Sequence, residues 1–282
     1  KRCLKLKWTV HSVSINLPPN KRRLNNVKYI RLDISKEKNL KKKLSMNYDY
    51  IVNLAGYVDH SNKAKTMKSH FNGCKNLAKF FLNRKIKKFI QIGSGLEYGK
   101  LKSPQIESKN NLQKTYSTYA AAKLLSTRYL LDLKKKKNFP VTILRLYQVY
   151  GPKQDVNRII PITITNALSN KKFDCSSGNQ FKDFLYIDDL IDILIKILKK
   201  RNTASIINVG SGKPIKVKKL ILNICELVGG GYPKFGVIPL RKDEINKLYP
   251  NLSILRKTSN WRPKIRLNDG LKKTIRYFAQ EI

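Results

Sequence analysis

The sequence predicts an α/β protein with a doubly wound parallel sheet and a smaller C-terminal lobe. Apolar, β-branched segments alternate with helix-length segments over the first 150 residues, and several of the apolar segments end directly at Gly, Ser or Asp. Such alternation is typical of βαβ units, whose parallel sheets carry helices on both faces. Ligands of these sheets bind outside the carboxyl ends of the strands, so we expect the functional residues to lie there.

Five strands are expected in this first part of the chain. Residues 1–7 read as the end of a helix, and the strand that follows them breaks at Pro18 and Pro19. Runs of apolar and β-branched residues place the strands at residues 9–15, 27–32, 50–54, 88–92 and 141–146. Helix-length periodicity follows the early strands, and a long helix at 119–137 precedes the last strand.

After residue 150 the alternation of strand-like and helix-like segments becomes less regular. We expect helices at about 158–170 and 188–199, a turn-rich stretch at 175–180 and an isolated strand at 205–209. The predicted organisation is therefore a nucleotide-binding domain at 1–150 and a substrate-binding lobe at 151–282. Segments at about 183–209 are expected to return to the first domain.

The chain is strongly basic. Its 282 residues include 59 Lys and Arg against 18 Asp and Glu, which gives a formal net charge of +41. Lysine is spread through nearly every segment and is not gathered in one arm or interleaved with stacking aromatic residues. We therefore interpret the charge as a compositional bias and disfavour a nucleic-acid partner.

Other classes of protein are disfavoured by what the sequence lacks. No run approaches the roughly 18 to 20 apolar residues of a membrane-spanning helix, and no charged and then apolar leader opens the chain. We therefore expect a cytoplasmic protein without a membrane partner. The four cysteines and three histidines show no ligand spacing, so no metal site or disulfide framework is expected.

Tyr119 and Lys123 are the pair that points to chemistry. Residues four apart lie on one face of a helix, one turn from each other. An ammonium group near a phenol lowers the pKa of that phenol, so Tyr119 could exchange a proton with a sugar hydroxyl or ketone. Ser94, at the end of a predicted strand, could share the same substrate oxygen.

Five motifs in this order carry a family resemblance. They lie at residues 93–99, 119–123, 145–152, 182–189 and 208–212. Together they resemble the extended short-chain dehydrogenases, and the NAD-dependent epimerase/dehydratase family describes them best. The resemblance implies a Rossmann-type sheet, NAD or NADP as cofactor, and a nucleoside-diphosphate sugar as substrate. It also implies a homodimer through the helices at about 63–84 and 115–137.

The resemblance assigns roles to individual residues. The catalytic set would be Ser94, Tyr119 and Lys123, with Lys123 also bonding the nicotinamide ribose. The other cofactor contacts would be Asp33 and Ile34 at the adenine, Leu54, Ala55 and Gly56 at the pyrophosphate and ribose, Asn72 at the floor of the nicotinamide pocket, and Tyr147 at its flank. The substrate would contact Ser94, Gln148, Lys182 and Arg241, with the last two at its diphosphate.

Two departures from the family pattern concern the cofactor. The glycine-rich turn after the family's first strand does not occur in this sequence, so we expect an N-terminally truncated chain that lacks this strand and turn. Such a chain is expected to bind NAD(P) weakly until the upstream segment is restored. The strand that should end in an acidic residue ends at Asn16, with Lys21, Arg22 and Arg23 nearby, which leaves NADP open beside NAD.

A third departure concerns the reaction. Dehydratases of the family carry an Asp-Glu pair directly after the serine position, where this chain has Gly95 and Leu96. Strand alternation would turn the next residue, Glu97, to the other side. Dehydration is therefore disfavoured, and C4 epimerisation or one-way reduction of a 4-keto sugar remain open. The alternative is a non-catalytic NAD(P)-sensing or RNA-associated protein of this fold, against which the complete Ser94, Tyr119 and Lys123 set argues.

Overall fold

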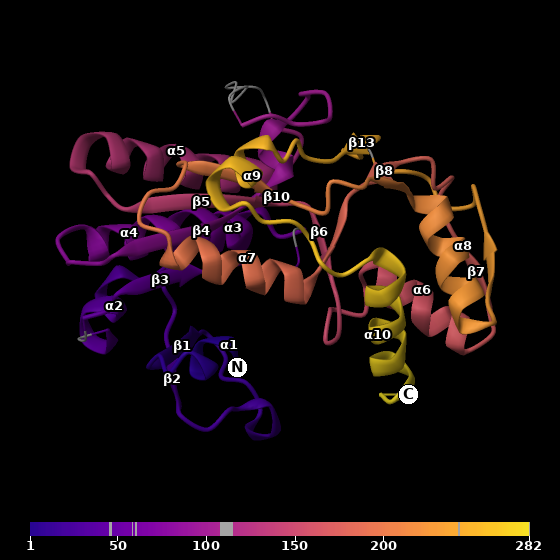
Figure 1. Cartoon of the computed structure of the whole chain (residues 1–282), viewed down its shortest axis with the longest axis horizontal. Coiled ribbons are helices and arrows are strands. Elements are labelled where there is room, and N and C mark those ends of the chain that lie inside the picture. Colours follow the sequence, from indigo (N-terminus) through magenta and orange to yellow (C-terminus); the bar gives the residue numbers. More distant parts are fainter. Residues whose placement is uncertain (45–46, 58, 60, 108–114, 242, 282) are drawn as a thin grey trace. The chain divides into compact units, whose positions relative to one another are not determined.

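The computed structural model describes residues 1–44, 47–57, 59, 61–107, 115–241 and 243–281 (Figure 1). The chain forms two compact units. Unit 1 consists of residues 1–93 and 115–143, and unit 2 consists of residues 94–114 and 144–282. The domain boundary expected at residue 150 stays a prediction. No helix in the described part of the chain has the length and apolar character to cross a membrane.

Unit 1 contains all five of the strands expected before residue 150. The strands are β1 (Val10–Ser14), β2 (Val27–Arg31), β3 (Tyr50–Asn53), β4 (Lys88–Ser94) and β5 (Val141–Leu146), of which β4 and β5 continue into unit 2. β1 and β2 form a two-stranded parallel sheet, whereas β3, β4 and β5 lie in a second sheet in that order (Figure 1). β3 and β4 are parallel, with Ile51 opposite Phe89.

Aromatic contacts join the two sheets of unit 1. The ring of Trp8 stacks on that of Tyr50 at a centroid distance of 5.0 Å. His11 Nδ1 lies 2.9 Å from the hydroxyl of Tyr48, and the two rings meet edge to face. Both contacts lie where β1 and β3 begin, so they fix the N-terminal ends of these strands.

Helices of unit 1 follow most of the strands, as expected. They are α1 (Arg2–Lys5), η1 (Asn20–Arg22), α2 (Glu37–Lys43), α3 (Lys63–Met67), η2 (Lys68–Asn72), α4 (Gly73–Leu82) and α5 (Thr118–Lys137). Helix-length periodicity was expected after β1, but only the short 3-10 turn η1 follows it. Pro18 and Pro19 prevent a longer helix there, because proline has no N–H group for the helical hydrogen bonds.

Three of these elements make one continuous helix with an irregular middle. α3 leads into the π-helical turn η2 and then into α4, and all three pack against α5. The Asn62 side chain caps the start of α3 by accepting from the N–H of Lys65. Ser117 caps α5 in the same way, and Asn138 ends it in a left-handed conformation. The predicted helix at 119–137 is thus confirmed.

Unit 2 is built from short strands and six helical segments among its described residues. The strands are β6 (Gln148–Tyr150), β7 (Lys172–Asp174), β8 (Phe181–Lys182), β9 (Phe184–Tyr186), β10 (Ile206–Val209), β11 (Ile215–Lys216), β12 (Tyr232–Lys234) and β13 (Lys247–Leu248). The helical segments are η3 (Gly95–Tyr98), α6 (Ile159–Leu168), α7 (Ile187–Lys199), α8 (Val217–Val228), α9 (Ser253–Ser259) and α10 (Leu267–Ala279). The helices expected at 158–170 and 188–199 are confirmed. The strand expected at 205–209 is also present as β10, but it is not isolated, because it lies next to β5 in the sheet of β3, β4 and β5.

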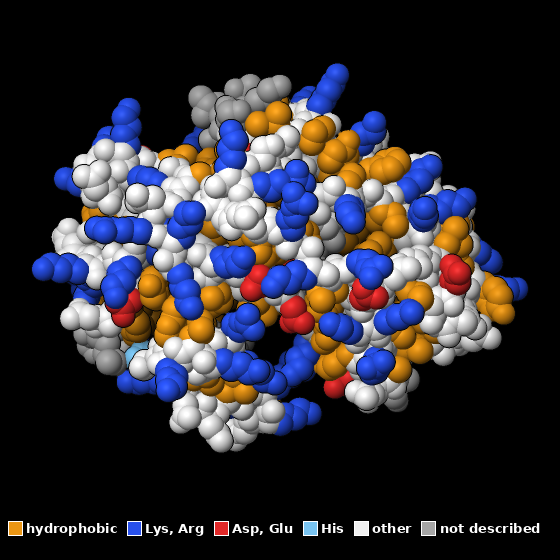
Figure 2. All heavy atoms as spheres, in the orientation of Figure 1, with side chains coloured by type: hydrophobic (Ala, Val, Ile, Leu, Met, Phe, Trp, Pro, Cys, Tyr) orange, Lys and Arg blue, Asp and Glu red, His pale blue; other side chains and the backbone are white. Residues whose placement is uncertain are grey.

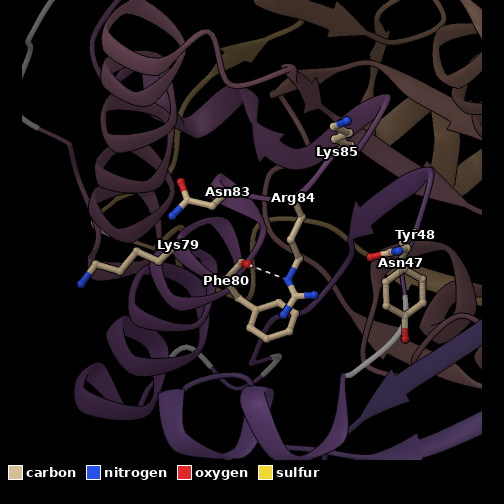
Figure 3. Close-up of a pocket in the computed structure, with 7 residues that line it drawn as sticks. All are labelled: Asn47, Tyr48, Lys79, Phe80, Asn83, Arg84 and Lys85. Carbon is tan, nitrogen blue, oxygen red and sulfur yellow. Dashed lines mark hydrogen bonds between the residues drawn. The ribbon is translucent and has the colours of Figure 1, made fainter.

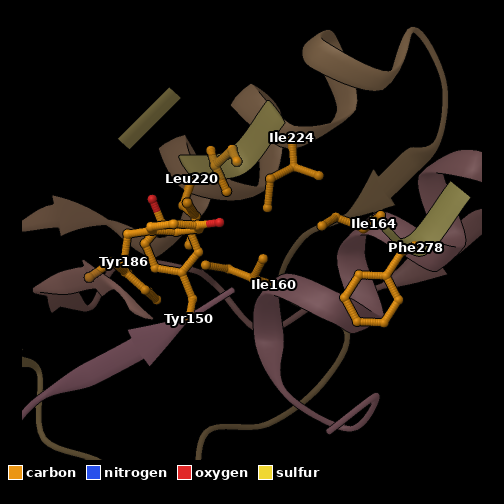
Figure 4. Packing of buried hydrophobic residues seen from close by; sticks show 9 residues of the cluster. Tyr150, Ile160, Ile164, Tyr186, Leu220, Ile224 and Phe278 are labelled. Atoms are coloured by element: carbon orange, nitrogen blue, oxygen red, sulfur yellow. The ribbon is translucent and has the colours of Figure 1, made fainter. Parts of the chain in front are cut away.

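The core of unit 2 lies between α6, α8, α10 and strands β6 and β9 (Figure 4). Leu220 and Ile224 of α8 are fully buried there with Ile160 and Ile164 of α6. Gly270 of α10 lies against the Tyr150 hydroxyl, where a Cβ would overlap with it. Only glycine therefore lets α10 approach this closely.

Cationic side chains cover the molecule widely. Figure 2 shows Lys and Arg side chains over all parts of the visible face, with few acidic ones among them. On the face that the figure shows, this even spread of cations agrees with a lysine bias in the composition of the chain.

A pair of leucines on α8 tests the core. Leu220 is 0% exposed and Leu222 is 47% exposed. Replacing Leu220 by Ala is expected to lower the free energy of unfolding by about 2–5 kcal/mol, because the substitution leaves a cavity. Leu222→Ala, the control on the same helix, is expected to lower it by less than about 1 kcal/mol. Denaturant unfolding of both variants measures this, and equal losses would contradict the described core.

Candidate active site

Lys123 is held inside unit 1 by a backbone carbonyl. Its side chain comes from α5, the residue is 4% exposed, and Nζ donates a 2.7 Å hydrogen bond to the carbonyl oxygen of Ile92 in β4. Its neighbours Ala120 and Ala122 are also buried. A buried ammonium group needs such an acceptor, so this bond fixes where the positive charge lies near the carboxyl end of β4.

The carbonyl of Ile92 is held by the side-chain amide of Gln91, which is itself bonded by side chains from two other elements. Gln91 Nε2 donates to it at 3.0 Å. The other atom of this amide, Oε1, accepts from Asn53 Nδ2 of β3 at 2.7 Å and from the Cys74 thiol of α4 at 3.2 Å. The acceptor of Lys123 is therefore part of a buried network across β3, β4 and α4.

Tyr119 lies one turn before Lys123 and shares its helix face. Lys123 Nζ is 5.8 Å from the centroid of the Tyr119 ring. The imidazole of His70 meets the same ring edge to face, with centroids 5.0 Å apart and an angle of 84° between the planes. The phenol is thus placed by a cation on its own helix and by a ring from η2.

The turn after β3 presents the residues expected at the pyrophosphate. Leu54, Ala55 and Gly56 are all exposed, and Leu54 has 68% of its surface accessible. Asn53 Oδ1 accepts from the N–H of Ala55 and so shapes the turn. A Cβ on Gly56 would overlap with Cε1 of His70, so the turn can lie against this ring only with glycine there.

Asp33 and Ile34 meet the start of α4. Asp33 Oδ1 accepts from the N–H and the hydroxyl of Ser35, at 2.9 and 2.6 Å. The side chain of Ile34 packs on Gly73, where a Cβ would lie 3.0 Å from it. Asn72 is exposed and helps to line a polar hollow of about 380 Å³ with Ser35, Glu37, Lys75, Asn76 and Lys79.

Most of the residues expected at the cofactor thus belong to unit 1, and their contact with a dinucleotide stays a prediction. The exposed turn of Leu54, Ala55 and Gly56 lies at the end of β3, and a polar hollow lined by Ser35 lies next to Asp33 and Ile34 in the chain. The side chain from η2 that contacts Tyr119 is His70. Asn72, which was expected at the nicotinamide, is exposed beside the hollow.

Ser94 begins unit 2 and is fixed by a capping box. Its Oγ accepts from the N–H of Leu96 at 3.2 Å, and its own N–H donates to Glu97 Oε1 at 2.7 Å. These bonds start the 3-10 helix η3 directly after β4. Because Oγ accepts from the backbone, its own hydrogen remains for donation to another acceptor.

Glu97 shows where strand alternation fails. β4 ends at Ser94, and the following 3-10 turn folds the carboxylate back onto the serine N–H. Glu97 Oε2 accepts from Arg145 Nε at 2.9 Å, and neither side chain is exposed. The Arg145 guanidinium lies 4.2 Å from the centre of the Tyr98 ring, and burial raises the pKa of Tyr98 to about 12.

Tyr147 lies beside the same turn. A Cβ on Gly95 would be 2.6 Å from its ring, so Gly95 is required by the position of the tyrosine. The Tyr147 hydroxyl donates to Gln105 Oε1 at 2.8 Å. Burial raises the pKa of Tyr147 well above its ordinary value, and the phenol therefore stays neutral.

The two basic residues expected at a diphosphate gather around one carboxylate. Lys182 is largely buried, and its Nζ bonds the carboxylate of Glu244 and, at 2.8 Å, the carbonyl of Ile245. Arg241 is exposed, and its Nη2 lies 3.3 Å from the other oxygen of Glu244. Gln148, in β6, donates its N–H to the carbonyl of Asp183.

Asp183 connects two of the sequence motifs. It is fully buried, and its carboxylate accepts from the N–H groups of Ser211 and Gly212 at 2.6 and 2.7 Å. Burial raises the pKa of Asp183, and these bonds act in the opposite direction. A Cβ on Gly210 would lie 2.8 Å from this carboxylate, so the glycines of that motif serve the turn.

Sequence reasoning missed His70 and Glu244. Glu244 follows Arg241 by three residues, a spacing that could have indicated the ion pair. His70 lies in a helix whose π-helical turn leaves no clear pattern in the sequence, so nothing marked its contact with Tyr119. No group of three or more His, Cys, Asp or Glu side chains in the described residues could hold a metal ion.

A second, larger hollow shares Lys79 with the polar hollow beside Asn72. It measures about 580 Å³ and is lined by Asn47, Tyr48, Lys79, Phe80, Asn83, Arg84 and Lys85 (Figure 3). Arg84 lies over the Phe80 ring at 4.1 Å and donates to the Phe80 carbonyl. Its lining residues at 47–48 precede β3 and those at 83–85 precede β4, whereas Lys79 and Phe80 belong to α4. This part of the hollow is therefore at the amino ends of the two strands, and the expected ligand residues are at the carboxyl ends.

The Glu97–Arg145 pair makes a testable stability claim. Glu97→Ala leaves a buried guanidinium without its carboxylate and is expected to lower the free energy of unfolding by about 3–5 kcal/mol. Asp132→Ala removes the half-exposed pair with Lys136 on α5 and is expected to change it by less than about 1 kcal/mol. Chemical denaturation compares the two variants, and a loss at Glu97 no larger than that at Asp132 would argue against the pair.

Comparison with known proteins shows a family match and similar curated proteins. The model of the NAD dependent epimerase/dehydratase family matches residues 1–210. CDP-abequose synthase of Salmonella muenchen is 33% identical over 135 residues, which cover 47% of this chain and 46% of that protein. The dTDP-D-glucose 4,6-dehydratase of Homo sapiens is 29% identical over 202 residues, covering 70% of this chain and 57% of that protein. The chain thus spans about half the length of these curated relatives.

Solved structures agree on the fold. UDP-glucose 4-epimerase of Thermotoga maritima, solved with UDP-glucose, has a TM-score of 0.88 at 22% identity and covers 99% of this chain and 94% of its own. UDP-glucuronic acid 4-epimerase of Bacillus cereus, solved with UDP-glucuronic acid and NAD, has a TM-score of 0.87 at 23% identity and covers 100% and 94%. The α/β fold is therefore Rossmann-like, and the chain belongs to the NAD-dependent epimerase/dehydratase family of the extended short-chain dehydrogenases.

Proposed function

We propose that this chain catalyses C4 epimerisation or 4-keto reduction of a nucleoside-diphosphate sugar, with NAD or NADP as cofactor. The observation that carries the proposal is the pair Tyr119 and Lys123. The two residues share one face of α5, and the cation is bonded to the carbonyl of Ile92 at the end of β4. The family contains NAD-dependent enzymes that modify nucleotide sugars, which agrees with this choice.

The cofactor would be held mainly by unit 1. Asp33 and Ile34 would contact the adenine side, and the exposed turn at Leu54, Ala55 and Gly56 would contact the phosphates. When bound, NAD(P) supplies the acceptor or donor of a hydride. Asn72 and Tyr147 remain proposed contacts at the nicotinamide, and Lys123 a proposed contact at its ribose.

Each catalytic residue has a proposed task at the sugar. Tyr119 takes a proton from the sugar hydroxyl in the oxidising direction and returns it to the ketone oxygen in the reducing direction. Lys123 supplies the positive charge that stabilises the phenolate between these steps. Ser94 donates its hydroxyl hydrogen to the same sugar oxygen. This hydrogen is available because Oγ acts as an acceptor in its bond with the N–H of Leu96.

Dehydration would need a further acid and base, and the residues after Ser94 do not offer them. Gly95 has no side chain, and Leu96 has an apolar one. Both oxygens of Glu97 are engaged, one by the N–H of Ser94 and one by Arg145. A carboxylate held in this way has no free oxygen for proton transfer to a substrate, which supports epimerisation or keto reduction.

The diphosphate would bind in unit 2. Lys182 and Arg241 are the cations assigned to it, and Gln148 is assigned to the sugar. Lys182 is already paired with Glu244, so the approaching diphosphate would share this cation with a carboxylate. We also propose a homodimer through the helices at about 63–84 and 115–137, which correspond to α3, η2, α4 and α5.

Replacing Tyr119 by Phe tests the proposal. The substitution removes only the hydroxyl, so kcat on a nucleoside-diphosphate sugar is expected to fall by about 10²–10⁴-fold while the fold remains intact. Tyr129→Phe on the same helix is the matched control and is expected to keep its kcat. The assay follows sugar conversion by NMR, with circular dichroism as the folding check. Unchanged turnover in Tyr119→Phe would refute the catalytic assignment.

A further inference from the structure

His70 is buried in unit 1 and has no role in the proposed mechanism. It is 5% exposed and belongs to η2, the π-helical turn between α3 and α4. Turns of this kind occur frequently at functional sites, because the extra residue displaces a side chain from the regular helical path. The displaced side chain here is an imidazole between two parts of the candidate active site.

One side of the imidazole contacts the catalytic tyrosine. The rings of His70 and Tyr119 meet edge to face at a centroid distance of 5.0 Å and an angle of 84°. Aromatic pairs prefer this geometry, so the contact favours one orientation of the phenol. The His70 carbonyl also accepts from Ser126 Oγ of α5 at 2.9 Å, which fastens η2 to the helix that carries Tyr119.

The other side contacts the turn assigned to the cofactor. His70 Nε2 lies 3.2 Å from both the N–H nitrogen and the carbonyl oxygen of Tyr57. Either tautomer therefore finds a partner, as an acceptor from the N–H or as a donor to the carbonyl. Gly56 lies against the same ring, where any Cβ would overlap with it.

We propose that His70 is a positioning residue that joins the turn at 54–57 to the phenol of Tyr119. Its ring orients Tyr119, and its Nε2 holds the turn in the shape that receives the cofactor. This inference rests on the proposed function in two respects: it takes Tyr119 as the proton-transfer residue and the turn at 54–57 as part of the cofactor site. Since the contact with Tyr57 needs a polar atom and the contact with Tyr119 needs an aromatic ring, two substitutions can separate them.

His70→Gln keeps a polar atom near Tyr57 but removes the ring. Tyr119 is then expected to lose its orientation, and kcat is expected to fall about tenfold, because small displacements of a catalytic group have large effects on rate. The Kd for NAD(P) is expected to stay within about twofold of the original value, since the turn keeps its hydrogen bond.

His70→Phe makes the opposite change. It keeps an aromatic edge against Tyr119 and removes the bond to Tyr57. The Kd for NAD(P) is expected to rise about tenfold, whereas kcat at saturating cofactor is expected to stay within about twofold. A side chain with a merely structural role would not give these opposite results.

His11→Gln is the matched control. His11 also meets a tyrosine edge to face and bonds its hydroxyl, but that tyrosine is Tyr48, outside the candidate site. Its kcat and Kd are expected to match those of the original chain. Thermal unfolding of all three variants is the check that each of them is folded.

A further readout needs neither substrate nor cofactor. In protein labelled with ¹³C at the tyrosine Cζ, the Tyr119 signal is identified as the one lost in Tyr119→Phe. His70→Gln is expected to shift this signal and His11→Gln to leave it in place. A Tyr119 signal unmoved by His70→Gln would overturn the proposal even if the chain turned over no sugar. An equal fall of kcat and cofactor affinity in both His70 variants would overturn it as well.

Discussion

The hydrogen bond from Lys123 Nζ to the carbonyl of Ile92 is the interaction on which the candidate site depends. It joins α5 to the end of β4 and buries an ammonium group that only a firmly held acceptor can stabilise. Gln91, Asn53 and Cys74 hold that acceptor through a buried network. Tyr119 is placed relative to this cation by one helical turn, so the position of the phenol follows from the position of the amine.

Unit 2 places Ser94 by different means. There a carboxylate, Glu97, takes the serine N–H, and Arg145 holds the carboxylate in a fully buried pair. Burial of two charged groups costs free energy unless each is bonded to the other. Conformations of η3 that separate Glu97 from Arg145 are therefore unfavourable. The same engagement removes Glu97 from the groups that could assist the loss of water. The two bonds of Glu97 therefore position Ser94, and in the proposed function they also disfavour dehydration.

The sequence predicted the strands of unit 1 and the long helix α5 well, because apolar and β-branched runs bounded by Gly, Pro and Asp are strong local signals. Short strands such as β8 and β11 have two residues each and were not predicted, since pairing partners far along the chain decide them. The alternation argument for Glu97 was wrong because the strand ends three residues earlier. The contact of His70 with Tyr119 depends on a π-helical turn and on Gly56, which are fixed by tertiary packing. The roles assigned to the site residues by resemblance stay predictions.

The central claim is that Tyr119 and Lys123 serve proton transfer at a sugar carbon without loss of water. The most direct measurement is the mass and NMR spectrum of the product formed from UDP-, dTDP-, CDP- and GDP-sugars and from their 4-keto forms, with NAD(P)H absorbance followed in parallel. The account predicts a product of unchanged mass without net consumption of cofactor, or a product that has gained two hydrogens with NAD(P)H consumed in equal amount. A product that has lost water would contradict it.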